Sequence, residues 1–200
     1  MSAAQRQIAW ISPEEYLIGE EDSPVRHEYI DGQVFAMAGA NTPHGRIALN
    51  LATAVDTHLR DLPCETFIAD MKVGISRSGP YYYPDVLVTC NPGDLRRNSV
   101  KRHPRLIVEV LSPHSGVMDR GCKLDDYQSL ASLQEYVLVS QDRLQVECFR
   151  RGPDGEWKAP QVYTEGDEVR LESIDLTLPI ERIYNRVRFG PYDVEDEDGD

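Results

Sequence analysis

The feature that most constrains the fold of this 200-residue chain is an apolar run with one charge inside it. Residues 105–113 read RLIVEVLSP, and every residue from Leu106 to Leu111 is apolar except Glu109. An apolar run that does not alternate with polar residues is typical of a β-strand covered on both faces. The run therefore predicts a sheet with helices packed on it, and it places a carboxylate in the core.

An ionised carboxylate in a protein core is costly unless it is paired, hydrogen-bonded, protonated or bound to a metal. Asp85 lies in the strand-like segment 81–90. If that segment and the strand at 105–112 are neighbours, Asp85 and Glu109 converge on one side of the sheet. Two acids that close repel each other, and a hard divalent cation such as Mg²⁺ or Mn²⁺ relieves the repulsion. The alternative is that each acid is structural, bonded to backbone or to a buried arginine.

Lys123 lies in a segment, 119–132, whose apolar spacing predicts a helix. It borders the apolar stripe of that helix and could reach the two acids. Two carboxylates, a lysine and a bound metal ion are a set of groups typical of phosphodiester hydrolysis. The alternative for Lys123 is an exposed side chain, or one whose stem is buried while its ammonium reaches water.

The remaining patterns predict a mixed α/β chain in a single domain over residues 1–190. A capped helix is expected from Ser12 to about Gly19, and a hairpin turn at Asp31-Gly32. Further helices and strands are expected at 43–59 (helix), 65–76 (strand), 135–140 (strand), 143–151 (hairpin partner), 156–163, 167–171 and 174–178 (short strands), and 179–187 (short helix or coil). The predicted architecture is a mixed β-sheet flanked by helices, with an N-terminal hairpin and a C-terminal β extension.

Several segments together resemble the PD-(D/E)XK nuclease superfamily. More narrowly, the chain resembles a bacterial family of restriction-endonuclease-like proteins formerly described as a domain of unknown function. The segments are HEYIDGQVFAMAG, PHGRIALNL, YPDVLV, LIVEVLSP and DRGCKLDDYQSLASLQEYVLV, which span residues 10–140 approximately. The resemblance implies a restriction-endonuclease-like fold and a metal-dependent endonuclease that hydrolyses nucleic-acid phosphodiester bonds, with DNA as the expected substrate.

The resemblance also implies roles for individual residues. Asp85 and Glu109 would be the ligands of Mg²⁺ or Mn²⁺, and Glu28 an extra ligand or a group that orients the base. The alternative for Glu28 is an ordinary carboxylate on the surface of a strand. The superfamily's usual lysine, two residues after the glutamate, is replaced by Leu111, and Lys123 would substitute for it. Leu111 also leaves open a catalytically inactive nuclease fold that acts as a binding or regulatory module.

Charge bears on the expected partners. The formal net charge is −13, which argues against binding of nucleic acid through overall charge. A basic loop nevertheless leads into the strand of Glu109, and phosphate contacts are expected from its residues Arg96, Arg97, Lys101 and Arg102. A solvated run of charges is the alternative. Residues 81–83, three tyrosines, could stack on bases or pack in the sheet.

Further expectations are less specific. We expect a soluble, cytoplasmic protein without a membrane segment, since no signal peptide or long apolar run is present. A homodimer is expected if both DNA strands are cut. Residues 191–200 are expected to be an acidic, disordered tail. The scattered cysteines are expected to be reduced thiols: Cys64, Cys90, Cys122 and Cys148.

Three residues near these segments are expected to be structural rather than catalytic. His44 follows Pro43 at a helix start, where a surface position or a bond to backbone is favoured over a position facing the site. Asp119 is expected to cap a helix, and Tyr127 to belong to the core.

Overall fold

The structure is a computed structural model that describes residues 10–37, 39–112 and 116–190. The expected acidic tail, 191–200, lies outside the described residues. Among the described residues, no helix combines the length and apolar character needed to cross a lipid bilayer.

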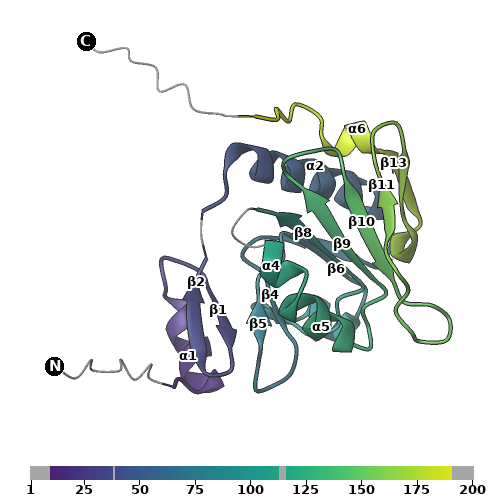
Figure 1. Ribbon diagram of the computed structural model, residues 1–200. Helices are drawn as coiled ribbons and strands as arrows, with labels where there is room; N and C mark the ends of the chain where they lie inside the picture. The colour runs from purple at the N-terminus through teal and green to yellow at the C-terminus, as the bar shows by residue number, and fades with distance from the viewer. Residues whose placement is uncertain (1–9, 38, 113–115, 191–200) are drawn as a thin grey trace, which may run out of the picture.

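One long helix, several short helices, two sheets and a separate hairpin make up the fold (Figure 1). The helices are α1 (Pro13–Glu21), α2 (Thr42–Leu59), α3 (Pro92–Leu95), α4 (Gly116–Asp119), α5 (Cys122–Ser129) and α6 (Ile180–Ile183), with a 3₁₀ turn at Glu172–Ile174. The strands are β1 (His27–Ile30), β2 (Gln33–Ala36), β3 (Glu65–Ile68), β4 (Lys72–Gly74), β5 (Tyr81–Tyr82), β6 (Val86–Thr89), β7 (Val100–Lys101), β8 (Leu106–Leu111), β9 (Glu135–Ser140), β10 (Val146–Arg150), β11 (Gln161–Tyr163), β12 (Glu168–Leu171) and β13 (Leu176–Pro179).

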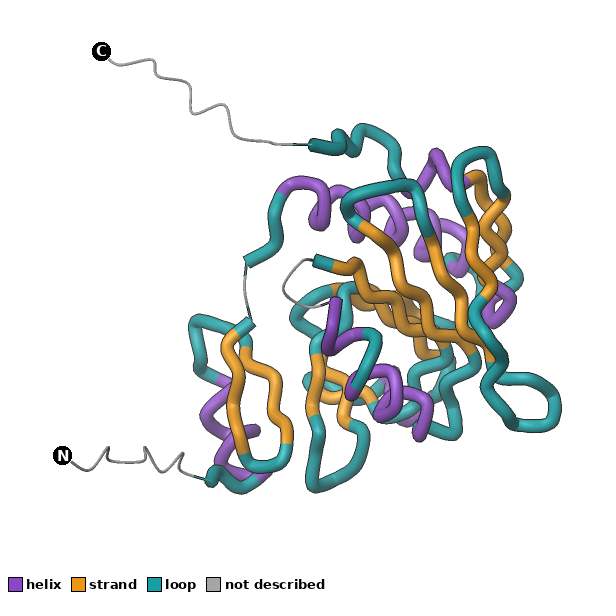
Figure 2. Tube along the Cα trace, in the orientation of Figure 1, coloured by secondary structure: helices purple, strands orange, loops and turns teal. Residues whose placement is uncertain are grey.

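The main sheet has the order β11-β10-β9-β8-β6-β3. Strand β8 runs parallel to β9 and antiparallel to β6, so the sheet is mixed as predicted. Figure 2 shows α2 passing behind these strands and α5 lying in front of them. Leu106, Val108 and Val110 pack in the cluster of α2, while Ile107 packs in the cluster of α5. The alternating faces of β8 are therefore both covered, which explains its uninterrupted apolar run.

A second sheet, β2-β1-β5-β4-β7, lies beside the first. It contains the predicted hairpin, whose turn residues Asp31 and Gly32 have φ angles of 49° and 82°. The expected strands 65–76 and 81–90 are each divided between the two sheets, so these boundaries were wrong. Ala69 has a left-handed φ of 40°, which interrupts the first. Pro84 lacks the amide hydrogen that a continuous ladder requires, which interrupts the second.

Other local predictions are confirmed or corrected by the same geometry. Ser12 and Glu15 form the expected capping box, although the helix continues beyond Gly19 to Glu21. The predicted helix at 119–132 is instead two short helices. Because α4 ends at Asp119 and α5 begins after Gly121, Asp119 does not cap the start of a helix.

The cysteines and tyrosines also differ from some expectations. Cys64 and Cys90 form a disulfide, so the prediction of reduced thiols is wrong for this pair. The bond follows from the pairing of Glu65 with Thr89, which sets the two flanking cysteines opposite each other. The thiols of Cys122 and Cys148 are free, the first exposed and the second buried. Residues 81–83 are all buried, so packing explains the three tyrosines and base stacking is wrong.

Candidate active site

The pairing of β6 with β8 brings the two predicted acids together. Val86 lies opposite Val108 in this antiparallel pair, so the next step of the register sets Asp85 opposite Glu109. Burial is the main cause of the raised pKa of Glu109, and the negative charge of Asp85 adds to the rise. The interpretation of the two segments as neighbouring strands is therefore confirmed.

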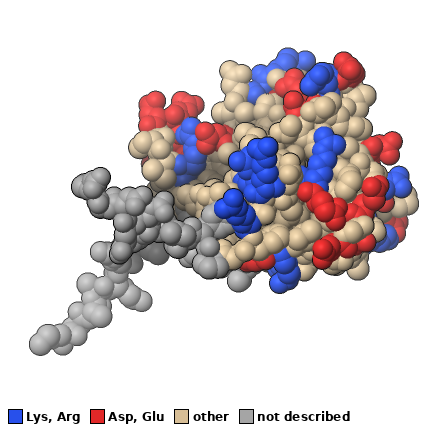
Figure 3. Space-filling model, turned by 90° about the horizontal axis from the view of Figure 1, so that it is seen from above, with Lys and Arg blue, Asp and Glu red and all other residues tan. Residues whose placement is uncertain are grey.

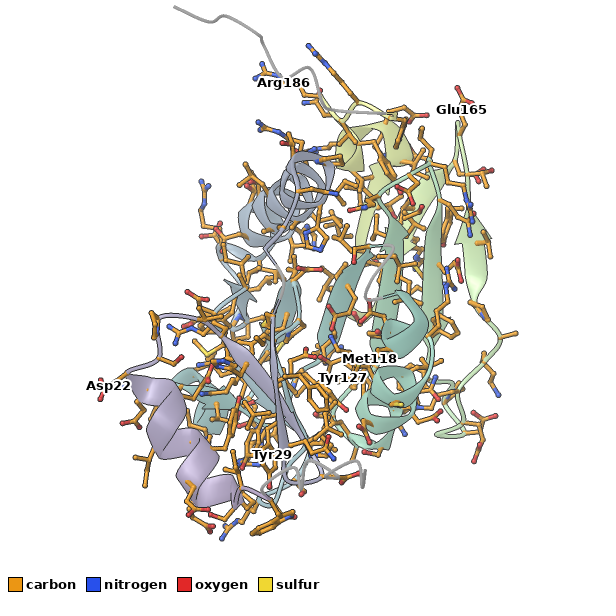
Figure 4. The ribbon with its side chains drawn as sticks, turned by 60° about the vertical axis from the view of Figure 1, so that its left-hand side comes forward. Asp22, Tyr29, Met118, Tyr127, Glu165 and Arg186 are labelled. Carbon is orange, nitrogen blue, oxygen red and sulfur yellow. A yellow bond between two sulfur atoms is a disulfide. The ribbon has the colours of Figure 1, made fainter. Side chains whose placement is uncertain are left out.

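Lys123 lies among three acids. Its Nζ is 2.8 Å from Glu28 Oε1, 3.2 Å from Asp119 Oδ1 and 3.5 Å from Glu109 Oε1. The Lys123 side chain is only 7% exposed, so it does not extend into solvent. Tyr127, on the side of α5 that faces the strands (Figure 4), donates its hydroxyl to Glu109 Oε1 at 3.1 Å. The structure thus joins Glu28, Glu109 and Lys123 in one buried cluster and adds Asp119 and Tyr127 to it.

The charges of this cluster do not balance. Burial raises the pKa of Glu109 well above its ordinary value, and the carboxylates of Asp119, Asp85 and Glu28 add to the effect, while Lys123 opposes it. Burial by itself lowers the pKa of Lys123, but the charges of Glu109, Glu28 and Asp119 outweigh burial and the pKa rises. One ammonium group therefore faces a surplus of buried negative charge, which protons or a bound cation must neutralise.

Asp85 forms the more open edge of the site. Its Oδ2 accepts a hydrogen bond from the Val110 amide at 2.7 Å and lies 3.3 Å from His44 Nε2. The side chains of His44 and Asp85 are 16% and 18% exposed, more than those around Lys123. Burial lowers the pKa of His44, but the hydrogen bond and charge of Asp85 outweigh it and the net shift is upward.

A surface position for His44 is thus wrong, because its side chain faces Asp85, whereas the expected bond to backbone is present with Val110. Asn41 caps α2 and sets His44 in the first turn, at the end of the helix that meets Asp85. Asp119 and Tyr127 were also assigned structural roles only. A sequence signal existed for both, because Asp119, Lys123 and Tyr127 follow one another at intervals of four residues, the spacing of neighbours on one helical face.

Asp85 and Glu109 could hold a hard divalent cation. Their donors are carboxylate oxygens, and the buried Glu28 Oε1 and Asp119 Oδ1 lie nearby, each in contact with Lys123 Nζ. Among the described residues, no three His, Cys, Asp or Glu side chains converge closely enough to enclose a metal by themselves. Mg²⁺ commonly takes only one or two carboxylates from the protein and completes its shell with water and substrate phosphate. The donor chemistry and the surplus charge therefore fit such an ion.

The expected phosphate contacts do not share this location. The loop that holds them joins the end of β6 to the start of β8, which is the opposite end of the strand pair from Asp85. Lys101 is 1% exposed and donates its Nζ to the carbonyls of Asp94 and Arg97, so the contact predicted for Lys101 is wrong. Arg102 donates to the Ser76 carbonyl at 2.6 Å. Arg96 and Arg97 are exposed but lie away from the acids.

The chain is similar to known proteins over most of its length. It is 38% identical over 179 residues to the uncharacterized protein slr1290 of Synechocystis sp., covering 90% of this chain and 94% of that protein. It is 33% identical over 159 residues to a second protein of the same organism, the uncharacterized protein sll1609, covering 78% and 90%.

A solved structure has the same fold. The crystal structure of a protein from Anabaena variabilis, described as "a putative nuclease belonging to DUF820", superposes with a TM-score of 0.70 at 18% identity. The match covers 87% of this chain and 97% of that one, and confirms the restriction-endonuclease-like fold. A family model matches residues 13–181. The chain therefore belongs to the Uma2 family, which is described as "Putative restriction endonuclease".

Proposed function

We propose that the protein is a divalent-metal-dependent nuclease that hydrolyses phosphodiester bonds of nucleic acid, with DNA as the expected substrate. The observation that carries the proposal is that Asp85 and Glu109 lie opposite each other on adjoining strands, beside a buried cluster in which one ammonium faces three carboxylates. Membership of a family of restriction-endonuclease-like proteins supports the same reaction class.

Each residue of the site has a task in this proposal. Asp85 and Glu109 hold the cation, which when bound supplies Lewis-acid stabilisation of the phosphate and lowers the pKa of water. The Val110 amide and His44 fix one oxygen of Asp85. The Tyr127 hydroxyl orients Glu109. Lys123 supplies positive charge beside the scissile phosphate.

Glu28 and Asp119 have a supporting task. Their carboxylates lie 2.8 Å and 3.2 Å from Lys123 Nζ, and hold the ammonium in position beside Glu109. Burial lowers the pKa of Lys123, but the charges of Glu109, Glu28 and Asp119 outweigh burial, so the lysine stays charged at neutral pH and can face a phosphate without first taking up a proton.

The test is nicking of supercoiled plasmid with Mg²⁺, with Mn²⁺ and with EDTA. Wild-type protein is expected to nick the plasmid only when metal is present. Asp85→Asn and Glu109→Gln are expected to lose about 100-fold or more of the rate, since each removes charge from the group that holds the cation. Asp154→Asn, an exposed acid outside the site, is the matched control and should keep full activity.

Equal nicking by wild type and Asp85→Asn would overturn the proposal, because the activity would then come from a contaminant. The second candidate is a catalytically inactive binding module. Leu111 in place of the superfamily's lysine favours it, as does the commitment of Lys123 to three carboxylates. Binding of DNA or RNA without cleavage of either would support that candidate.

A further inference from the structure

One end of the main sheet carries both the candidate active site and a group of arginines. Strands β8 and β9 end there, β6 and β10 begin there, and the loop 141–145 joins β9 to β10 at the same end. The first turn of α2 also lies there, because His44 contacts Asp85. Figure 3 looks onto the top of Figure 1, where α2, α6 and the loop between β9 and β10 lie, and shows blue side chains across the middle of this face.

Three of these arginines come from different elements that are tied together by hydrogen bonds. Arg46 lies one turn before Asn50 on α2, and Asn50 donates to the carbonyl of Asn185, next to Arg186. The Tyr184 hydroxyl donates to the Ser140 carbonyl and accepts from the Gln145 amide, at the ends of the loop that carries Arg143. We call Arg46, Arg143 and Arg186 the basic face.

The arginines of the basic face are not engaged by acids. Within residues 10–37, 39–112 and 116–190, no ion pair joins any of the three to a carboxylate, whereas Arg120 and Arg150 are paired with Glu147 and Glu135. The exposed acids of the adjoining segments are Asp142 and Glu181. Arg143 does donate its Nε to Gln145 Oε1 at 2.7 Å, but this bond leaves its charge unneutralised. In a chain whose net charge is −13, three guanidinium groups at one end of a sheet that form no ion pair with a described carboxylate are a local excess of positive charge.

Arg186 adds a second observation. Its backbone φ is 61°, in the left-handed region that glycine or asparagine adopts at less cost. Arg186 is exposed, so packing in the core does not explain an arginine at this position. Conformational cost of this kind is often retained where the side chain itself has a function.

We infer that the basic face binds the phosphate backbone of nucleic acid and leads it to the site of Asp85 and Glu109. This inference rests on the proposed function and names the surface that binds its substrate. Arg46 follows His44 by two residues, and His44 and Asp85 are the most open groups of the site, so a strand lying across the basic face passes the edge at which a phosphate can enter. Guanidinium groups suit phosphate because their fork of donors matches its oxygens.

The experiment measures binding of a fluorescent DNA duplex by anisotropy in EDTA, over a range of salt concentrations, so that no hydrolysis is needed. Arg143→Gln/Arg186→Gln is compared with Arg96→Gln/Arg97→Gln, which removes the same number of exposed arginines from the opposite end of the sheet. The first variant should lose about tenfold or more in affinity, and its slope of log K against log salt should fall by about 1.8 for two lost phosphate contacts. The second should match the wild type.

Several results would overturn the inference. They are an absence of binding by wild type at low salt, equal binding by wild type and the Arg143/Arg186 variant, or a larger loss in the Arg96/Arg97 variant. Equal competition by poly-glutamate at the same charge concentration would also overturn it, because the face would then take acidic polypeptide. The plasmid assay separates the two proposals. If the wild type nicks plasmid but the Arg143/Arg186 variant binds DNA as the wild type does, only the proposed role of the basic face is rejected. If the wild type binds DNA through the basic face but does not nick plasmid, only the proposed nuclease activity is rejected.

Discussion

Replacing Lys123 by methionine removes the one ammonium of the buried cluster while keeping a side chain of similar length. Glu28, Glu109 and Asp119 would remain buried without their shared cation. Removing one partner from a buried ion pair costs about 3–5 kcal/mol, since the remaining charge is uncompensated. For a domain of this size, that loss lowers the melting temperature by roughly 6–20 °C.

The matched control is Lys158→Met. Lys158 and Asp154 also form a lysine–carboxylate pair with a spacing of four residues, but both side chains are 53% exposed. Solvent screens such pairs, so the free energy of unfolding is expected to change little. Urea unfolding of wild type and both variants at neutral pH gives the comparison.

Acidification should separate a charge effect from a packing effect. Burial raises the pKa of Glu109, and the loss of Lys123 removes the main group that opposes this rise. The variant's deficit is therefore full at pH values above the folded-state pKa of Glu109, and it shrinks as the pH falls through that pKa and the carboxylate takes up a proton. A Lys123→Met deficit within about 1 kcal/mol of the Lys158→Met deficit, or one that does not change with pH, would refute the reasoning.

Two other predictions concern stability. Arg120 donates to both oxygens of Glu147 at 2.6 and 2.7 Å, and this hydrogen bonding lowers the pKa of Glu147. Because Arg120 is 41% exposed, Glu147→Gln should lower the free energy of unfolding by only about 0.5–1 kcal/mol at neutral pH. The denaturation curves of variant and wild type should converge as the pH falls through the lowered pKa of Glu147. A difference that persists in acid would contradict this prediction. Gly32→Ala should lower the free energy of unfolding by about 1–2 kcal/mol, because φ is 82° and an added Cβ would lie 2.0 Å from the Trp10 ring. Gly45→Ala, inside α2 and with open space around it, should instead raise the free energy of unfolding by about 0.5–1 kcal/mol, and thermal melts of both variants give the comparison.

The sequence was most informative where the signal is local or strictly periodic. The uninterrupted run around Glu109 indicated a strand covered on both faces, and the two-residue period placed Glu109 on the face of Ile107, where α5 packs. The capping box at Ser12 and the turn at Asp31 depend on neighbouring residues only, and both are confirmed.

The missed features depend on contacts between distant segments. Whether His44 meets Asp85 is set by the angle at which α2 crosses the sheet, which residues 43–59 do not specify. The disulfide joins cysteines 26 residues apart, and only the pairing of β3 with β6 brings them together. The position of the basic loop was misjudged because proximity in sequence to Glu109 was taken as proximity in space. The loop enters β8 at one end of the strand, and Glu109 lies toward the other end.

The central claim is that Asp85 and Glu109 share a divalent cation, and anomalous scattering from a crystal soaked in Mn²⁺ tests it most directly. The account predicts one manganese peak within about 2–2.5 Å of an oxygen of each carboxylate. A crystal at saturating Mn²⁺ with no peak between them, in which Glu109 still contacts Lys123 and Tyr127 and Asp85 still contacts His44 and the Val110 amide, would contradict it.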